Sequence, residues 1–245
     1  MAVISASHLA SVFGILGNIL SFLVFLAPLP TFYKIYKRKS TERFQSIPYA
    51  VALFSAMLTF YYAFLKTNAM LLITINSIGM VIECTYLVFF MIYATKEAKI
   101  YTTKLLIFFN VGAYGFVMLF TLLFSHGDQR VEIVGWICAV FSVCVFVAPL
   151  SIMRLVIKTR SVEYMPFLLS FFLALSAVMW FFYGFIKKDY FIATPNILGF
   201  SFGIAQMILY IIYKDKKKAA DQLPESITVI DLSALEMQGE FQHDE

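Results

Sequence analysis

Charged residues are scarce in this sequence and are excluded from long stretches of it. Asp, Glu, Lys and Arg make up 14% of the residues, whereas hydrophobic residues make up 61%. Seven segments are free of charge except for Glu83: 1–33, 44–65, 67–94, 105–125, 133–153, 164–186 and 190–213. Each is long enough to cross the hydrocarbon core of a bilayer as a helix, which takes about 20 apolar residues. The sequence therefore excludes a soluble globular domain and predicts an all-α membrane protein with seven transmembrane helices.

The residues that usually carry enzyme chemistry are also rare. The three cysteines all fall within the predicted spans, and the three histidines are widely separated, so no metal or disulfide spacing is present. No Ser/His/Asp set or glycine-rich phosphate loop lies in a suitable place. We therefore expect no enzyme activity, no metal and no other cofactor. The net charge of +4 reflects where the lysines lie and does not indicate a nucleic-acid partner.

The basic residues lie almost entirely in alternate loops. Of the 19 lysines and arginines, all but four fall on the side where the last span ends; the four are Lys66, Arg130, Lys187 and Lys188. Because basic loops stay in the cytosol, the N-terminus is predicted to face outward and the C-terminus to be cytosolic. The apolar run at the N-terminus is too long for a cleavable signal peptide and is interpreted as the first span.

One phrase occurs twice. FLAPLPTFYKIYKRKSTE from Phe25 and FVAPLSIMRLVIKTRSVE from Phe146 agree at seven of eighteen positions at a spacing of 121, and TINSIG recurs as TPNILG at a spacing of 120. Because three crossings invert the chain, a single extra helix is needed to make the two copies parallel. We therefore predict a 3+1+3 arrangement, with a first repeat over 1–94, a linker helix over 95–132, a second repeat over 133–213 and a disordered cytosolic tail over 214–245.

Parallel repeats of this kind are typical of transporters that bind their substrate between the repeats. Several motifs follow one another along the chain: LAP at 26–28, KSTE at 39–42, IPY at 47–49, TIN at 74–76, APLSIM at 148–153, SVEYMPF at 161–167, WFFYG at 180–184 and PNILG at 195–199. In these motifs the sequence resembles the plant SWEET (MtN3/saliva) family of bidirectional sugar transporters over residues 8 to about 214.

The side chains expected at mid-membrane depth fall into pairs that the repeat relates, as a cavity on the pseudo-two-fold axis requires. These candidate binding residues are Ser21 and Ser142, Val24 and Val145, Ser55 and Ser176, Thr59 and Trp180, and Asn76 and Asn196. Serine and threonine in membrane helices can instead join helices together, which is the alternative for each serine. An unsatisfied amide in lipid is costly, so the paired asparagines favour a polar cavity more strongly.

Amides, hydroxyls and an indole, with almost no charge, match a sugar better than an ion, an amino acid or a phosphate. The resemblance implies the same, because Asn76, Asn196 and Trp180 fall on the sugar-binding positions of SWEETs. Many sucrose-carrying members have a second tryptophan at the position of Thr59, whereas Val145 matches the sucrose type. We therefore expect an atypical member of the sucrose-type group that carries sucrose, hexoses such as glucose, or both.

Residues for two gates can also be proposed. Four prolines near the cytosolic ends of their spans are expected to form an inner hinge that matches the SWEET proline tetrad: Pro28, Pro48, Pro149 and Pro166. The resemblance further implies that Tyr62, Lys66 and Asp189 close the outer side through a hydrogen bond or an ion pair.

Glu83 is a functional suspect, because acids are rare within membranes. The second repeat has Gly203 at its position and no cation is expected near it, so downhill uniport is favoured over proton coupling. A proton-coupled exporter of amino acids or other small solutes of the PQ-loop type, or a seven-helix receptor, are the alternatives. The resemblance implies the plasma membrane as location, and GxxxG at Gly199 and Gly203 would permit a homotrimer.

Overall fold

The computed structural model describes residues 5–41, 44–162 and 165–214, so Arg43, the lysines at 216–218 and the expected tail from 215 onward lie outside the described residues. Every element in the described ranges is helical. In chain order they are α1 (Ala6–Phe25), α2 (Leu29–Arg38), α3 (Ile47–Leu65), α4 (Met70–Tyr93), α5 (Lys96–Leu105), the π-helix η1 (Leu106–Ala113), α6 (Tyr114–Phe124), α7 (Gly127–Val145), α8 (Val147–Thr159), α9 (Phe167–Ile186) and α10 (Tyr190–Tyr213).

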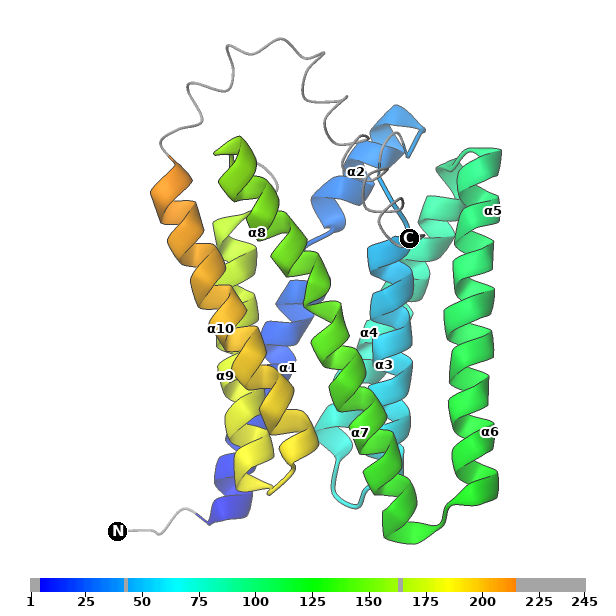
Figure 1. Cartoon of the computed structure of the whole chain (residues 1–245), viewed down its shortest axis with the longest axis vertical. Coiled ribbons are helices and arrows are strands. Elements are labelled where there is room, and N and C mark those ends of the chain that lie inside the picture. Colours follow the sequence, from blue (N-terminus) through cyan, green and yellow to red (C-terminus); the bar gives the residue numbers. More distant parts are fainter. Residues whose placement is uncertain (1–4, 42–43, 163–164, 215–245) are drawn as a thin grey trace, which may run out of the picture.

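These elements form seven spans that run along the long axis of the molecule (Figure 1). The spans in the described residues are Ala6–Arg38, Ile47–Leu65, Met70–Tyr93, Lys96–Phe124, Gly127–Thr159, Phe167–Ile186 and Tyr190–Tyr213. Their outward faces carry large apolar side chains, such as Phe116, which is 68% exposed, and Val88, which is 62% exposed. Exposing such continuous apolar surfaces to water is unfavourable, whereas exposing them to lipid is not. The predicted class, an integral multi-pass membrane protein, is confirmed.

The fourth and fifth spans are longer than the charge-free segments that predicted them. The fourth begins at Lys96 instead of residue 105, and the fifth covers Gly127–Thr159 instead of 133–153. The hydroxyl of Thr95 accepts a hydrogen bond from the backbone N–H of Ala98 and caps the start of α5. Lysine and glutamate are good helix formers, so a charge ends the apolar part of a span without ending its helix.

Helix breaks divide the first and fifth spans at corresponding places. Pro28 lies between α1 and α2, whereas α7 and α8 meet at Phe146, with Pro149 in the first turn of α8. Because proline has no N–H to continue the hydrogen-bond ladder, a bend at these two places is expected. Pro48 and Pro166 instead lie at the starts of α3 and α9, where a proline removes no hydrogen bond within the helix.

The repeat is visible in the backbone itself. Four non-glycine residues in the described ranges have a positive φ, and they form two pairs. Lys39 and Arg160 both have φ of 53° at the ends of α2 and α8, and they are separated by 121 residues. Asn68 and Lys188 have φ of 58° and 57° in the short α3–α4 and α9–α10 connections, and they are separated by 120 residues. The two copies therefore share unusual turn conformations as well as sequence.

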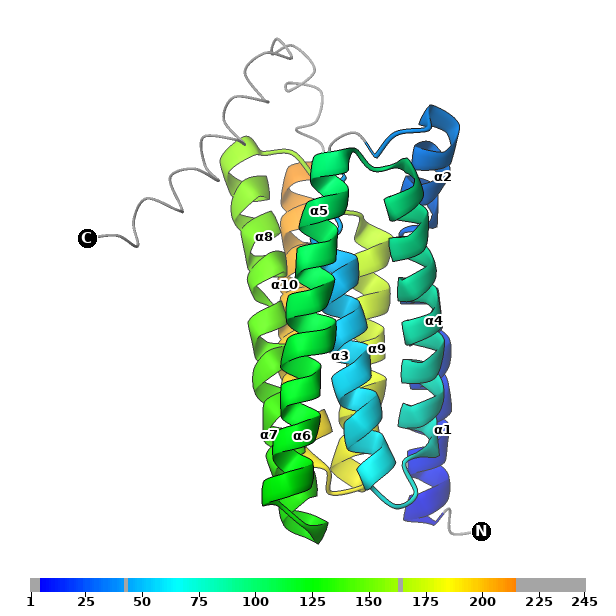
Figure 2. The same cartoon turned by 90° about the vertical axis from the view of Figure 1, so that its right-hand side faces the viewer.

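Each repeat is a bundle in which the third helix lies between the other two. α4 packs against α1 and α3, and α10 packs against α9 and against the α7–α8 span. The two bundles meet where α1 packs on α9 and α3 packs on α7. The linker formed by α5, η1 and α6 lies on the outside against α3 (Figure 2). This is the predicted 3+1+3 arrangement.

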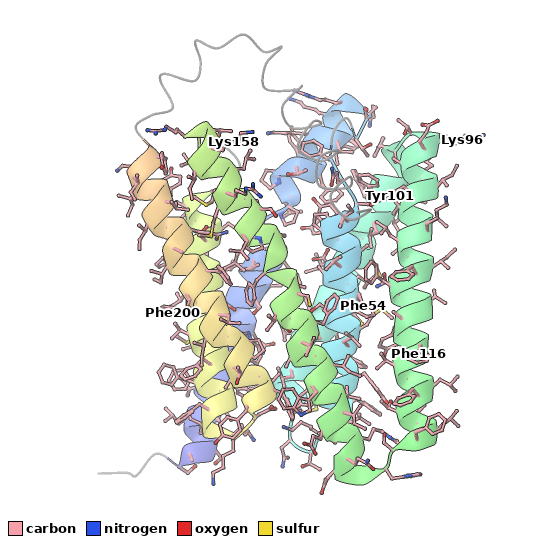
Figure 3. The ribbon with its side chains drawn as sticks, in the orientation of Figure 1. Phe54, Lys96, Tyr101, Phe116, Lys158 and Phe200 are labelled. Atoms are coloured by element: carbon pink, nitrogen blue, oxygen red, sulfur yellow. The ribbon has the colours of Figure 1, made fainter. Side chains whose placement is uncertain are left out.

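The two ends of the molecule differ in charge. Lys96 and Lys158 both lie at the upper end (Figure 3), close to where α2 and α8 end. We call this the basic end. The α3–α4 and α9–α10 connections, which contain Lys66 and Asp189, lie at the opposite end, which we call the far end (Figure 1).

Candidate functional site

A cavity of about 430 Å³ lies between α1 of the first repeat and the helices of the second repeat. Its lining residues are Ser21, Val24, Phe25, Val145, Phe146, Pro149, Leu173, Ser176, Ala177, Asn196, Gly199, Phe202, Gly203 and Gln206. None of these is charged, and four of them carry polar side chains. The cavity therefore offers neutral hydrogen-bonding groups within apolar and aromatic walls.

A second hollow, of about 380 Å³, lies between α3, α4 and η1. Its lining is apolar apart from the thiol of Cys84. Several of these side chains belong to the exposed outer surface, among them Val88 and Ile92. This hollow has no groups that would orient a polar substrate, so we assign the functional site to the cavity between the repeats.

Hydrogen bonds connect three of the predicted binding residues at the centre of the molecule. The indole N–H of Trp180 donates to the hydroxyl of Ser21 at 3.0 Å, and the hydroxyls of Ser21 and Ser176 are hydrogen-bonded at 3.0 Å. The indole also lies directly against Gly17, where a Cβ atom would be only 2.9 Å from Trp180 Cε2. Glycine at this position thus allows α1 and α9 to approach closely enough for the contact.

Asn76 on α4 and Asn196 on α10 make equivalent hydrogen bonds. Asn76 Nδ2 donates to the carbonyl of Leu72 at 2.8 Å, and Asn196 Nδ2 donates to the carbonyl of Ile192 at 2.7 Å. Each NH2 group is therefore engaged by the residue four positions earlier on the same helix. Each side chain retains its oxygen as an acceptor and a second N–H as a donor.

Two phenylalanines from the repeated phrase form apolar walls of the cavity. The ring of Phe25 lies against Gly79 of α4, where a Cβ atom would be 2.5 Å from Phe25 Cζ. The corresponding ring of Phe146 lies near Gly199 of α10, where a Cβ atom would be 3.5 Å from Phe146 Cζ. The walls are equivalent in the two repeats, but the contact is tighter in the first.

Five of the ten predicted binding residues line the cavity, and five lie outside its lining. The lining residues are Ser21, Val24, Val145, Ser176 and Asn196; the others are Ser55, Thr59, Asn76, Ser142 and Trp180. Trp180 is 8% exposed and packs against Gly17 of α1 and against Tyr183. Neither α3 nor α4 contributes to the lining. In this conformation the cavity therefore belongs mainly to the second repeat instead of lying evenly on the pseudo-two-fold axis.

Sequence reasoning missed eight lining residues, namely Phe25, Phe146, Leu173, Ala177, Gly199, Phe202, Gly203 and Gln206. Phe25 and Phe146 could have been found, because they stand at the same place in the repeated phrase. Gln206 could not be found in that way, since the first repeat has a tyrosine at its position. A search for symmetric polar pairs overlooks any residue whose counterpart differs in kind.

The three residues proposed to close one side are in contact at the far end. Asp189 accepts hydrogen bonds from the Tyr62 hydroxyl at 2.8 Å and from Lys66 Nζ at 2.6 Å, and Lys66 Nζ also donates to the Tyr62 hydroxyl at 3.2 Å. The side chain of Asp189 is 3% exposed and that of Lys66 is 28% exposed. This set, which we call the far-end latch, ties α3 of the first repeat to the start of α10 in the second.

Glu83 on α4 is 4% exposed and does not line the cavity. Its Oε2 atom has no hydrogen-bond partner among the described residues. A carboxylate buried without a cation is costly, so this position does not favour a permanent ion pair.

Two parallel helix bundles that enclose an uncharged cavity, and that are tied together at one end, have the architecture of a membrane transporter. Comparison with known proteins identifies the family. The family model described as "Sugar efflux transporter for intercellular exchange" matches residues 11–98 and 132–218, once in each repeat. The chain belongs to this family, the SWEET (MtN3/saliva) transporters.

Individual relatives are similar over most of their length. The chain is 60% identical to the bidirectional sugar transporter NEC1 of Petunia hybrida, covering 91% of this chain and 83% of that protein. It is 56% identical to the bidirectional sugar transporter SWEET13 of Oryza sativa, covering 96% of this chain and 84% of the relative. A solved structure of a eukaryotic SWEET transporter superposes with a TM-score of 0.81 at 32% identity, covering 86% of this chain and 99% of that one.

Proposed function

We propose that this protein carries sugars across a membrane in both directions by facilitated diffusion. The observation that carries the proposal is the cavity, whose lining combines the uncharged polar groups of Ser21, Ser176 and Asn196 with aromatic rings. A sugar presents many hydroxyl groups and an apolar C–H face, and both find partners there. An amino acid or an inorganic ion would need a charged partner that the lining does not supply.

The transport cycle follows from the two ends of the molecule. The far-end latch closes access from one side in the conformation described, while Gln206 and Pro149 extend the cavity toward the basic end. Opening the latch and bending at Pro28 and Pro149 would expose the cavity to the other side, which is alternating access. The positions of Pro48 and Pro166 at helix starts make them weaker hinge candidates. By the positive-inside rule the basic end is cytosolic, and the plasma membrane is the proposed location.

The proposed mode of transport is uniport, in which sugar moves without a coupled proton. A proton-coupled carrier needs an acid that reaches the substrate pathway, and Glu83 is the acidic residue buried in the described spans. Glu83 lies outside the cavity lining, and its Oε2 atom has no hydrogen-bond partner among the described residues, which supports transport down the sugar gradient alone. The proposed substrates are sucrose, hexoses such as glucose, or both.

The proposed domains are the two repeats over 1–94 and 133–213, the linker over 95–132 and the tail beyond. A homotrimer is consistent with the family resemblance, but the GxxxG pair that suggested it faces inward. A Cβ atom at Gly203 would be 2.7 Å from Ala174, and both Gly199 and Gly203 line the cavity. A trimer would therefore use other surfaces.

Uptake into liposomes that contain the purified protein tests the proposal. Radiolabelled glucose and sucrose are expected to enter faster than into protein-free liposomes, whereas labelled alanine is expected to enter at the protein-free rate. Faster entry of alanine with no change for either sugar would instead favour the amino-acid exporter.

A further inference from the structure

The basic-end half of the cavity has different residues in the two repeats. At the spacing of 120 that relates Asn76 to Asn196, Gln206 of α10 corresponds to Tyr86 of α4. At the spacing of 121 that relates Ser55 to Ser176, Ser170 of α9 corresponds to Tyr49 of α3. In the first repeat, both of these positions are therefore occupied by tyrosines.

The aromatic filling is compact. The ring of Tyr86 stacks on that of Phe32 with centroids 4.4 Å apart and lies 5.7 Å from that of Tyr49. The Tyr86 hydroxyl also donates to the carbonyl of Phe25, next to the break between α1 and α2, at 2.8 Å. Tyr49 and Tyr86 are absent from the cavity lining. The first repeat is therefore closed at this level, and its residues serve packing.

In the second repeat the same level is polar and open to the cavity. Ser170 donates a hydrogen bond to Gln206 Oε1 at 3.0 Å, and Gln206 itself lines the cavity. Among the described residues, no group accepts a hydrogen bond from the Gln206 NH2. The hydrogen bond to its oxygen fixes the Gln206 carboxamide and thereby orients its two unused N–H donors. A site that binds a hydroxyl group requires such oriented donors. Gly203, about one turn earlier on α10, lies directly against Ala174 of α9 and also lines the cavity.

The two polar levels of the cavity are well separated. Asn196 and Gln206 are ten residues apart on α10, which corresponds to about 15 Å along the helix axis. One sugar ring cannot reach both amides, whereas two linked rings extended along α10 can. The neutral lining between the two levels includes the ring of Phe202, against which the apolar face of a sugar can pack.

We propose that Gln206 forms a second sugar subsite, which binds the distal ring of a disaccharide while Ser21, Ser176 and Asn196 bind the first ring. Gln206 donates its NH2 to a sugar hydroxyl, and Ser170 is a positioning residue that holds the carboxamide. The inference rests on the proposed sugar transport and adds to it a determinant of substrate size. The competing explanation is that Ser170 and Gln206 only join α9 to α10.

Binding to the purified wild-type protein in detergent is the test, with sucrose and glucose titrated separately by calorimetry. Gln206→Leu keeps the size of the side chain but removes its donors. We expect the Kd for sucrose to rise about fivefold, the equivalent of one net hydrogen bond, and the Kd for glucose to change by less than about twofold. Tyr86→Phe is the matched control, because it removes a hydroxyl at the equivalent position outside the cavity, and it is expected to leave both Kd values unchanged.

An unchanged Kd for sucrose in Gln206→Leu, or an equal rise for both sugars, would overturn the subsite. Should Gln206→Leu fail to fold, Ser170→Ala replaces it; a rise in the sucrose-to-glucose Kd ratio supports the subsite, and an unchanged ratio with a lower melting temperature assigns the pair to helix packing. If the wild-type protein binds neither sugar, the proposed function fails instead, so the two failures are distinguishable.

Discussion

At the scale of single residues, Asn76 and Asn196 occupy corresponding positions in the two repeats and make the same hydrogen bond. Each donates its NH2 to the carbonyl four residues earlier, at 2.8 and 2.7 Å. The amide is thereby held in one orientation before any ligand arrives, which lowers the entropic cost of binding. Each amide retains its oxygen and a second N–H as hydrogen-bonding groups at a fixed place on its helix.

Replacing these asparagines tests their role. Asn196→Ala and Asn76→Ala are each expected to abolish most sugar uptake at matched membrane levels, because each removes hydrogen bonds from a desolvated site, about 1–3 kcal/mol apiece. The measurement is radiolabelled sugar uptake in cells that lack their own carriers.

Asn18→Ala provides the control for this prediction. Asn18 donates to the carbonyls of Gly14 and Leu71 and so ties α1 to α4 without lining the cavity. Its loss should lower stability while the sugar KM stays unchanged. Near-normal uptake by both Asn76→Ala and Asn196→Ala would place the pocket elsewhere.

Thr59 is expected to govern the choice between hexose and sucrose. A tryptophan there adds a stacking surface opposite Trp180, and such a contact contributes roughly 0.5–1.5 kcal/mol beyond burial. Thr59→Trp should therefore raise the sucrose-to-glucose uptake ratio by about two- to twelvefold. A flat or falling ratio would mean that Val145 and the width of the cavity set selectivity.

Symmetry between the repeats identifies candidate site residues but does not decide which member of each pair lines the cavity. Ser21, Val24, Val145, Ser176 and Asn196 have similar counterparts in the other repeat, and they line the cavity. Asn76 has the same chemistry as Asn196 but lies outside the lining, because one conformation of a carrier does not use its two halves equally. Which member of a symmetric pair lines the cavity depends on the conformation, so it cannot be predicted from the sequence pattern.

At the scale of elements, the far-end latch joins two helices that must separate during transport. Asp189 precedes the first residue of α10, and Tyr62 and Lys66 lie in the last turn of α3 and just beyond it. As a proposed gate, the contact combines a nearly buried carboxylate with a partly exposed lysine, so solvent moderates the cost of breaking it. A fully buried pair would be far more costly to break.

A double-mutant cycle on Lys66 and Asp189 tests the latch. Lys66→Met and Asp189→Asn are each expected to lower the melting temperature of the purified protein, and the double variant to lower it by less than the sum. The coupling expected for an ion pair with one partly exposed member is about 1 kcal/mol. Lys187→Met is the control, since Lys187 is exposed at the same end and should change nothing. Strictly additive effects would show that the two side chains do not act together.

The sequence predicts the number of helices well and their ends poorly. Absence of charge locates the part of each span that lies in lipid. The helices α5 and α8 nevertheless continue into charged residues, because a helix makes its backbone hydrogen bonds equally well in lipid and in water. Of the four prolines predicted to form a hinge, Pro28 and Pro149 lie near the breaks in the first and fifth spans, whereas Pro48 and Pro166 lie at helix starts. The π-helix η1 has no comparable signal in the sequence, and its cause is not evident from the residues that form it.

At the scale of the whole molecule, two parallel bundles share a backbone plan and differ in their side chains. The shared plan includes the helix breaks and the positive-φ turns, which set the geometry that both halves must keep during a cycle. The differences, such as Gln206 against Tyr86 and Gly203 against Glu83, concern the substrate pathway and its surroundings. Duplication thus supplies the framework, and we expect divergence between the copies to supply specificity.

Facilitated diffusion makes one prediction about the molecule as a whole, and it can be measured with radiolabelled sugar in liposomes that contain the purified protein. With an inward proton gradient and without one, the internal sugar concentration is expected to rise only to the external concentration, and a protonophore should change neither the level nor the rate. Accumulation above the external concentration that depends on the proton gradient would contradict uniport and would make Glu83 the first candidate for the coupling residue.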